Sequence, residues 1–107
     1  AVRVPISGGL AAFDRVRFRV SAPAPLRAWV QLRAPVGDTE RWGTTFYADP
    51  TERIIDLPLR SFLPIGVTSS EEPPLDRVDS LLFVVDTLNF LPGSRGSMRL
   101  SEIAFVR

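Results

Sequence analysis

The stretch Phe13-Asp14-Arg15-Val16-Arg17-Phe18-Arg19-Val20 decides the fold class of this 107-residue chain. From Arg15 onward, apolar side chains alternate with arginines. Because successive side chains of a β-strand point to opposite faces of a sheet, this pattern predicts a strand with one buried and one exposed face. The exposed arginines are expected to pair with acids on neighbouring strands rather than to form an anion site.

The same two-residue period recurs through most of the chain, most clearly from Arg27 to Ala34. Clusters of proline, glycine and serine separate further strand candidates, which are Val2–Ile6, Arg41–Ala48, Arg53–Leu59, Leu81–Asp86 and Ser97–Val106. About eight short strands without a convincing helix predict a single all-β domain over residues 1–107, either a sandwich or a barrel. Most prolines are expected at strand edges and in connections, where a missing amide donor costs least.

Three segments refine this arrangement. The run Leu81-Leu82-Phe83-Val84-Val85 is apolar on both faces, which indicates a central strand. The segment from Pro64 to Asp76 contains Glu71-Glu72-Pro73-Pro74 and predicts an exposed crossover between sheets, the most mobile loop of the domain. Trp42 and Phe46 are expected in the core or at its margin.

The last strand changes phase along its length. Its apolar pattern shifts from one face to the other between Leu100 and Ile103. A β-bulge at Ser101-Glu102 restores the phase and leaves the Glu102 carboxylate at a kink. An acid at such a position binds a cation or, more often, pairs with an arginine.

The amino-acid inventory excludes several classes of function. The chain has no histidine and no cysteine, and its 13 basic residues, all arginine, stand against 12 acids for a net charge of +1. Nucleophilic triads, Schiff-base lysines, P-loops and the usual zinc sites are therefore excluded. The near-neutral charge predicts no nucleic-acid or membrane partner, and no apolar run is long enough to span a membrane.

One type of enzyme is compatible with this inventory, a glycosidase that uses two carboxylates. Its candidates lie on or beside predicted strands, and they are Asp49, Asp56, Asp86 and Glu102. No local spacing of acids supports such a site, and a domain of this size rarely encloses a substrate cleft. The chain is therefore predicted not to be an enzyme.

Three stretches carry a family resemblance, namely 54–64, 75–86 and 96–103. Their pattern is a strand, a Pro-x-x-x-Phe step from Pro58 to Phe62, a Leu-Asp start before an apolar strand, and a closing glycine-led strand that ends in an acid and isoleucine. This pattern resembles the galactose-binding-like β-jelly-roll domains, and most of all carbohydrate-binding module family 11 and the complex I intermediate-associated domains. The resemblance implies a jelly-roll sandwich of two antiparallel sheets.

The resemblance also implies sugar binding through aromatic platforms flanked by polar groups. One strand presents Trp29, Gln31 and Arg33 on its outward face. If the neighbouring strand presents Arg41, Thr45 and Tyr47, the two form a patch suited to stacking on a pyranose ring and bonding its hydroxyls. The candidate ligand-binding residues are therefore Trp29, Gln31, Arg33, Arg41 and Tyr47.

Some relatives hold a structural calcium near the closing strand. In this chain Ser101 stands where the family pattern has its first acid, and Glu102 matches the second. Glu102 is therefore the candidate calcium ligand, although one carboxylate with carbonyl groups holds calcium weakly. No other cofactor is expected.

Two functional hypotheses stay open. In the first, the chain is a non-catalytic carbohydrate-binding module of a larger extracellular or cell-surface protein, and targets an attached enzyme or that protein to a polysaccharide. In the second, it is a structural or protein-docking jelly roll in which Trp29 contacts a neighbouring domain and no sugar binds. An exposed Trp29 beside Arg33 and Tyr47 in a groove favours the first, and a flat apolar patch favours the second.

Overall fold

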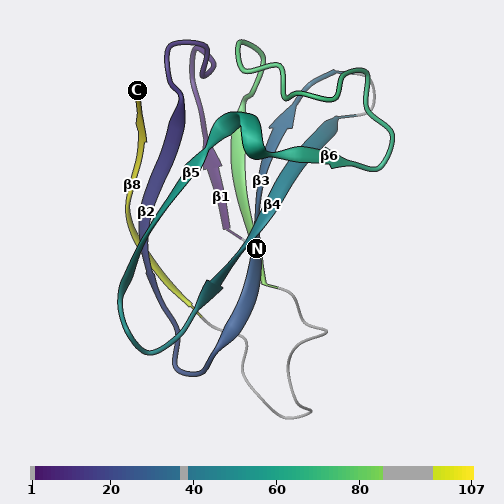
Figure 1. The fold of residues 1–107 in the computed structure, drawn as a ribbon. Helices are drawn as coiled ribbons and strands as arrows, with labels where there is room; N and C mark the ends of the chain where they lie inside the picture. Colours follow the sequence, from purple (N-terminus) through teal and green to yellow (C-terminus); the bar gives the residue numbers. More distant parts are fainter. Residues whose placement is uncertain (1, 37–38, 86–97) are drawn as a thin grey trace.

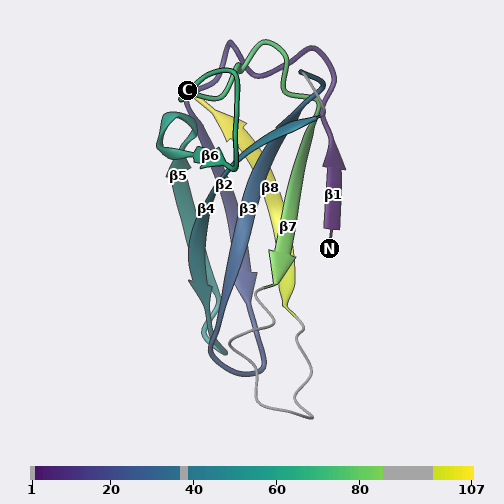
Figure 2. The ribbon, with the colours of Figure 1, turned by 90° about the vertical axis from the view of Figure 1, so that its right-hand side faces the viewer.

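The computed structural model describes residues 2–36, 39–85 and 98–107, which form two antiparallel β-sheets (Figure 1, Figure 2). The strands are β1 (Val2–Pro5), β2 (Arg15–Ser21), β3 (Leu26–Ala34), β4 (Glu40–Ala48), β5 (Arg53–Pro58), β6 (Leu63–Ile65), β7 (Ser80–Val85) and β8 (Arg99–Val106). One short 3₁₀ helix, η1 (Leu59–Ser61), precedes β6. The predicted all-β sandwich is confirmed. None of the helical structure in the described residues is long and apolar enough to cross a membrane.

The five-stranded sheet, here called sheet A, has the order β1-β7-β3-β4-β6, and the three-stranded sheet B has the order β5-β2-β8. The apolar strand β7 lies between β1 and β3, as its sequence predicts. On its inner face Leu81 and Phe83 are buried, whereas Leu82 and Val84 on its outer face are half-buried.

The core lies between the inner faces of the two sheets. The Phe18 ring of β2 meets the rings of Phe46 and Phe83 edge-to-face, at centroid distances of 5.0 and 5.1 Å. Such aromatic pairs add stability beyond the burial of their area. Trp42 is fully buried, and its indole Nε1 donates a hydrogen bond to the Ser70 carbonyl at 3.1 Å. Trp42 and Phe46 of β4 are therefore core residues, as predicted.

The corner between the sheets is formed by residues 58–65. β5 ends at Pro58, and the buried Phe62 ring anchors the chain after η1. β6 then pairs with β4 at the edge of sheet A. The sequence did not predict β6, because it has only three residues and contains Pro64.

The connection from Pro64 to Asp76 is neither wholly exposed nor a crossover between sheets, which corrects the prediction, because it leads from β6 to β7 within sheet A. It begins inside β6, and Pro73 is buried. Its middle is tied to β4, because the Glu40 carboxylate accepts hydrogen bonds from the backbone N–H and the hydroxyl of Ser69, the latter at 2.7 Å.

The predicted β-bulge in the closing strand is confirmed. Arg17 of β2 pairs with Ala104, but Arg19 pairs with Ser101, so β8 contains one extra residue there. Glu102 sits in this bulge with φ of 51°, a conformation that side-chain-bearing residues adopt rarely. The apolar pattern of β8 therefore stays on the inner face along the whole strand.

Candidate functional site on the outer face of sheet A

The pairing of β3 with β4 brings the five candidate ligand-binding residues onto one surface. Directly opposed residues share a face, and Arg33 opposes Arg41 while Gln31 opposes Gly43. One step further along, Trp29 opposes Thr45, and Arg27 opposes Tyr47. The condition set by the sequence, that β4 presents Arg41, Thr45 and Tyr47 beside β3, is therefore met. The role of these residues in binding stays a prediction.

Trp29 borders a hollow of about 370 Å³ between β3 and the β6 edge. The residues that line it are Trp29, Gly43, Thr44, Thr45, Leu63, Pro64 and Ile65. A smaller hollow of about 180 Å³ lies between Tyr47 and the start of β3, lined by Pro25, Leu26, Arg27 and Tyr47. Trp29 is half-buried, and Tyr47 is 69% exposed. The surface around the two aromatic rings is therefore grooved rather than flat.

The absence of a side chain at Gly43 makes the hollow beside Trp29 possible. A Cβ atom at this position would lie 2.8 Å from Cδ1 of Ile65 and 3.2 Å from Cγ of Gln31. These are closer than side-chain atoms normally approach. A glycine opposite Gln31 therefore lets β6 pack against β4 and keeps the bottom of the hollow open.

Two polar atoms on this face have no hydrogen-bond partner within the described protein. They are Oε1 of Gln31, a side chain only 7% exposed, and Nε of Arg33. Leaving a buried polar atom unsatisfied costs about 1–3 kcal/mol, so such atoms call for an explanation. Both atoms have almost no accessible surface, so a ligand on the outer face of sheet A contacts them only after their side chains turn outward.

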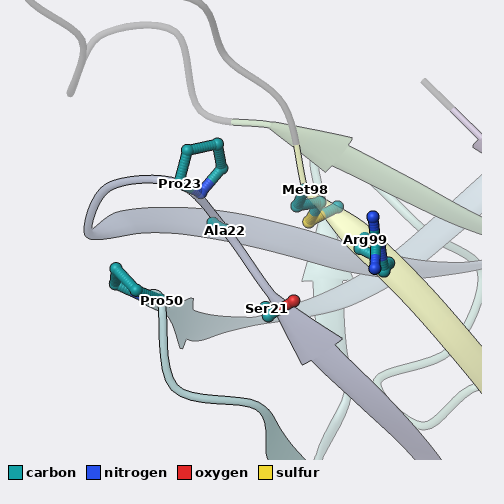
Figure 3. A pocket seen from close by; sticks show the side chains of 6 residues that line it. All are labelled: Ser21, Ala22, Pro23, Pro50, Met98 and Arg99. Carbon is teal, nitrogen blue, oxygen red and sulfur yellow. The ribbon is translucent and has the colours of Figure 1, made fainter.

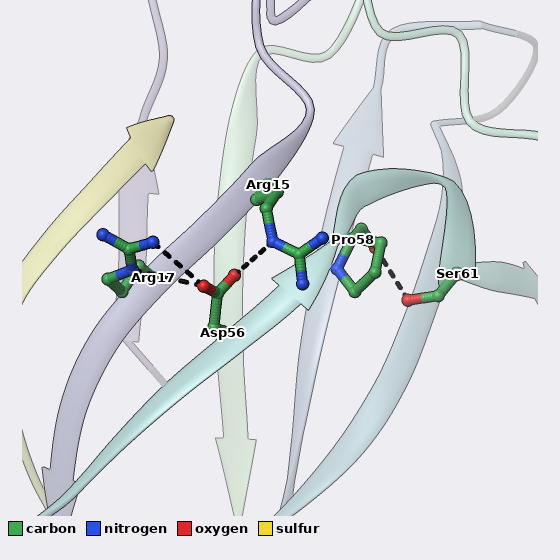
Figure 4. A network of polar contacts seen from close by, with 5 residues as sticks. All are labelled: Arg15, Arg17, Asp56, Pro58 and Ser61. Atoms are coloured by element: carbon green, nitrogen blue, oxygen red, sulfur yellow. Dashed lines mark hydrogen bonds and ion pairs between the residues drawn. The ribbon is translucent and has the colours of Figure 1, made fainter. Parts of the chain in front are cut away.

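The outer face of sheet B shows the acid partners that the sequence predicts for its arginines (Figure 4). Asp56 of β5 accepts hydrogen bonds from Arg15 Nε at 2.6 Å and from Arg17 at 3.0 Å. These bonds, that from Arg15 first, hold the pKa of Asp56 below its ordinary value. Arg19 pairs with Glu52 at 3.0 Å and with Glu102 of the bulge.

These pairs occupy the carboxylates of the described glycosidase candidates. Asp49 is bound by Arg53 at 2.8 Å, and this hydrogen bond lowers the pKa of Asp49. A general acid at neutral pH needs a raised pKa, and both Asp49 and Asp56 are shifted in the opposite direction. Glu102 is paired with Arg19, and Asp86 lies outside the described residues.

The Glu102 carboxylate also fits an ion pair better than a metal site. Its direct partner is the Arg19 guanidinium, which repels a second cation. In the part of the chain that the structure describes, no three histidines, cysteines or acids gather into a group that could hold a metal ion. Calcium binding at Glu102 stays an untested prediction without support from these contacts.

A third hollow, of about 450 Å³, lies where the β2–β3 and β4–β5 connections meet the start of β8 (Figure 3). Its described lining is Ser21, Ala22, Pro23, Pro50, Met98 and Arg99. None of these side chains is aromatic. This hollow therefore lacks the stacking surface that Trp29 and Tyr47 provide on sheet A.

The residues of the Trp29 hollow that the sequence did not predict are Gly43, Thr44, Leu63, Pro64 and Ile65. Three of them belong to β6, and a three-residue strand is too short to show a recognisable alternation. The sequence signal for this segment is an apolar residue, Leu63, beside a proline.

Comparison with known proteins supports the architecture. Neither the protein-family models nor the curated proteins that were searched contain a match to the chain. Among solved structures, it is similar to a family 11 carbohydrate-binding module from Clostridium thermocellum in complex with a β-1,3-1,4-mixed-linked tetrasaccharide, with a TM-score of 0.76 and 15% identity. It is also similar to the family 11 module of a cellulosomal cellulase from the same organism, with a TM-score of 0.70 and 18% identity.

Both structural alignments cover 97% of this chain, which spans 65% and 64% of the length of the two modules. At these identities the likeness concerns the fold. It confirms the jelly-roll architecture that the sequence resemblance implies.

Proposed function

We propose that the chain is a non-catalytic carbohydrate-binding module that holds a polysaccharide on the outer face of sheet A. The observation that carries this proposal is the β3–β4 register, which places the aromatic pair Trp29 and Tyr47 on one grooved face with Gln31, Arg33 and Arg41. One structural relative, a module in complex with a tetrasaccharide, supports the same class of ligand. The module would target an attached enzyme or surface protein to its polysaccharide, outside the cell or at its surface.

The arrangement suits a sugar chain in two ways. Trp29 and Tyr47 are diagonal neighbours across the strand pair, about 7–8 Å apart at their backbones, so their rings form an extended platform. Such rings stack on the apolar face of a pyranose. Next to them, the exposed Arg41 guanidinium donates hydrogen bonds to sugar hydroxyls, and the Gln31 oxygen accepts one once its side chain turns outward. That second contact satisfies a buried polar atom that has no partner within the described residues.

A second candidate function, docking of a neighbouring domain, rests on the apolar margin of the same face. Leu63 of β6 is 68% exposed, and Val67 in the following loop is 98% exposed. A protein partner that covers these two side chains would also cover Trp29. In that case the face would bind no sugar, so a direct measurement of sugar binding distinguishes the two functions.

The decisive experiment is affinity electrophoresis with calorimetry against soluble β-glucans, xylans, mannans and galactans. Trp29→Ala is compared with Ile54→Ala, which truncates an exposed side chain, 57% accessible, on the outer face of sheet B. We expect Trp29→Ala to weaken binding about thirtyfold or more, and Ile54→Ala to leave it unchanged.

Circular dichroism and thermal unfolding confirm that both variants fold. Binding that survives Trp29→Ala contradicts the platform. Absence of binding across the whole panel contradicts the proposed function and favours domain docking.

A further inference from the structure

Arg33 and Arg41 are a pair of like charges directly opposite one another on β3 and β4. Neither forms a hydrogen bond or ion pair with an acid in the part of the chain that the structure describes, and Arg41 is exposed. Like charges at directly opposed positions destabilise a sheet. The sheet therefore contains a repulsive pair of charges that no described acid compensates.

The acids among the described residues do not form ion pairs with either arginine. Glu40 is the one acid within the described strands of sheet A, and Ser69 occupies its carboxylate. Asp79, just before β7, donates its backbone N–H to the Arg33 carbonyl at 3.0 Å, and its carboxylate accepts a hydrogen bond from the Ser80 hydroxyl at 3.2 Å. A further arginine, Arg3 of β1, adds to the positive charge, because β1 and β7 place it on the same outer face, two strands from Gln31.

Resting on the proposed function, we propose that the bound polysaccharide is acidic, with an anionic group of one sugar seated between Arg33 and Arg41. Guanidinium groups form charge-assisted hydrogen bonds with the oxygens of a carboxylate or of a sulfate group. The exposed Arg41 guanidinium is one such donor, and Arg33 Nε, which is buried and has no partner within the described protein, becomes a second once its side chain turns outward. The anion removes the repulsion between the two arginines and supplies the negative charge that no described acid places between them.

The same geometry sets the minimum size of the ligand. Arg33 follows Trp29 by four residues along an extended strand, a separation of about 13 Å. The stacked sugar and the charged sugar are therefore different units of one chain that runs along β3. A single uronic acid is expected to bind far more weakly than an oligosaccharide.

The small net charge of the chain does not oppose this inference. Fields of exposed charges extend only about 8–10 Å at physiological salt. A ligand on sheet A therefore responds to its local arginines, whereas the arginines on the outer face of sheet B are held largely by their own acids.

The test uses pairs of polymers that differ in charge but not in backbone. Calorimetry compares polygalacturonate with its methyl ester, glucuronoxylan with its carboxyl-reduced form, and dextran sulfate with dextran. We expect the acidic member of at least one pair to bind about tenfold or more tightly at low salt, with a preference that shrinks as salt rises. A preference within the first two pairs identifies a carboxylate as the anion, and one confined to the third identifies a sulfate.

The variant Arg33→Gln/Arg41→Gln is expected to lose this preference. Its control, Arg60→Gln/Arg99→Gln, removes the same charge from exposed arginines outside the face and is expected to keep it. If the first variant fails to fold in thermal unfolding, Arg41→Gln alone, at an exposed position, replaces it.

The outcomes separate the two proposals. Equal affinity for the charged and neutral members overturns the acidic ligand and leaves the carbohydrate-binding function standing. Equal losses in the Arg33/Arg41 variant and in its control show attraction of any polyanion, which also overturns it. Binding to none of these polymers and to none of the neutral panel overturns the proposed function itself.

Discussion

The outer faces of the two sheets both carry arginines, but they give those arginines different neighbours. On sheet B, Arg15 and Arg17 share Asp56, and the bulge directs Glu102 to Arg19. On sheet A, Arg33 and Arg41 face each other with no described acid between them. The two faces contain the same type of charged residue. They differ in whether the opposite strand supplies an acid to pair with it.

The two outer faces also differ in their exposed apolar side chains. Sheet A presents Tyr47 beside Trp29 and two hollows, whereas the large exposed apolar side chain on the outer face of sheet B is Ile54. An aliphatic side chain among ion pairs offers no ring to stack on. Predictions that interchange features of the two faces therefore test the comparison directly.

The largest effect is expected from Gly43→Ala, which places a methyl group in the hollow beside Trp29 on sheet A. The added methyl group would clash with Ile65, and it would lie 3.1 Å from the Val30 carbonyl oxygen, which cannot move freely. We expect a loss of about 1–3 kcal/mol in the free energy of unfolding, together with weaker glycan binding. Denaturant unfolding measures the first and calorimetry the second.

The matched change on sheet B is Ala104→Val, at an exposed position opposite Arg17. It should alter the free energy of unfolding by less than about 0.5 kcal/mol. Equal effects of the two substitutions would mean that Gly43 has no special steric role.

Arg41→Glu gives sheet A the acid partner that sheet B already has. Opposite charges at a directly opposed pair are favourable, so the free energy of unfolding should rise by less than about 1 kcal/mol. Affinity for an acidic glycan should fall at least as far as in Arg41→Gln. A gain in the free energy of unfolding together with a loss of affinity would indicate that the repulsion between the arginines is retained for ligand binding. A loss of both would contradict this interpretation.

Asp56→Asn makes sheet B resemble sheet A, because it leaves Arg15 and Arg17 without their shared acid. We expect slightly lower stability and a new, weak attraction to polyanions that disappears at moderate salt. Without aromatic rings this face should not discriminate between glycans of equal charge. Selective binding by the new face would show that arginines alone create the specificity assigned to sheet A.

The smallest effect is expected in acid. The folded-state pKa values of Asp49 and Asp56 lie below those of the unfolded chain, so their contribution to stability is present above about pH 4 and lost as the pH falls through the folded values. Asp56→Asn should therefore shrink the drop in unfolding temperature between pH 7 and pH 3. An unchanged drop would show that the Asp56 pair contributes nothing to acid sensitivity.

Much of this architecture could be predicted from the sequence because it depends on local alternation. The two-residue period of β2 and β3 predicts their faces, and the phase change near Ser101 predicts the bulge. The register of β4 against β3 could only be stated as a condition, since it depends on how the connecting turn aligns the strands. The hollow beside Trp29 could not be predicted, because it requires β6 and the space above Gly43.

The edges of both sheets carry features that interrupt strand pairing. Sheet A ends in the short strands β1 and β6, which contain Pro5 and Pro64, while sheet B ends in β5 with Pro58 and in β8 with its bulge. Prolines remove amide donors, and a bulge twists an edge out of register with any partner. Copies of the domain brought side by side therefore meet edges that are poor templates for joining their sheets, which lowers the tendency of the domain to aggregate at high local concentration.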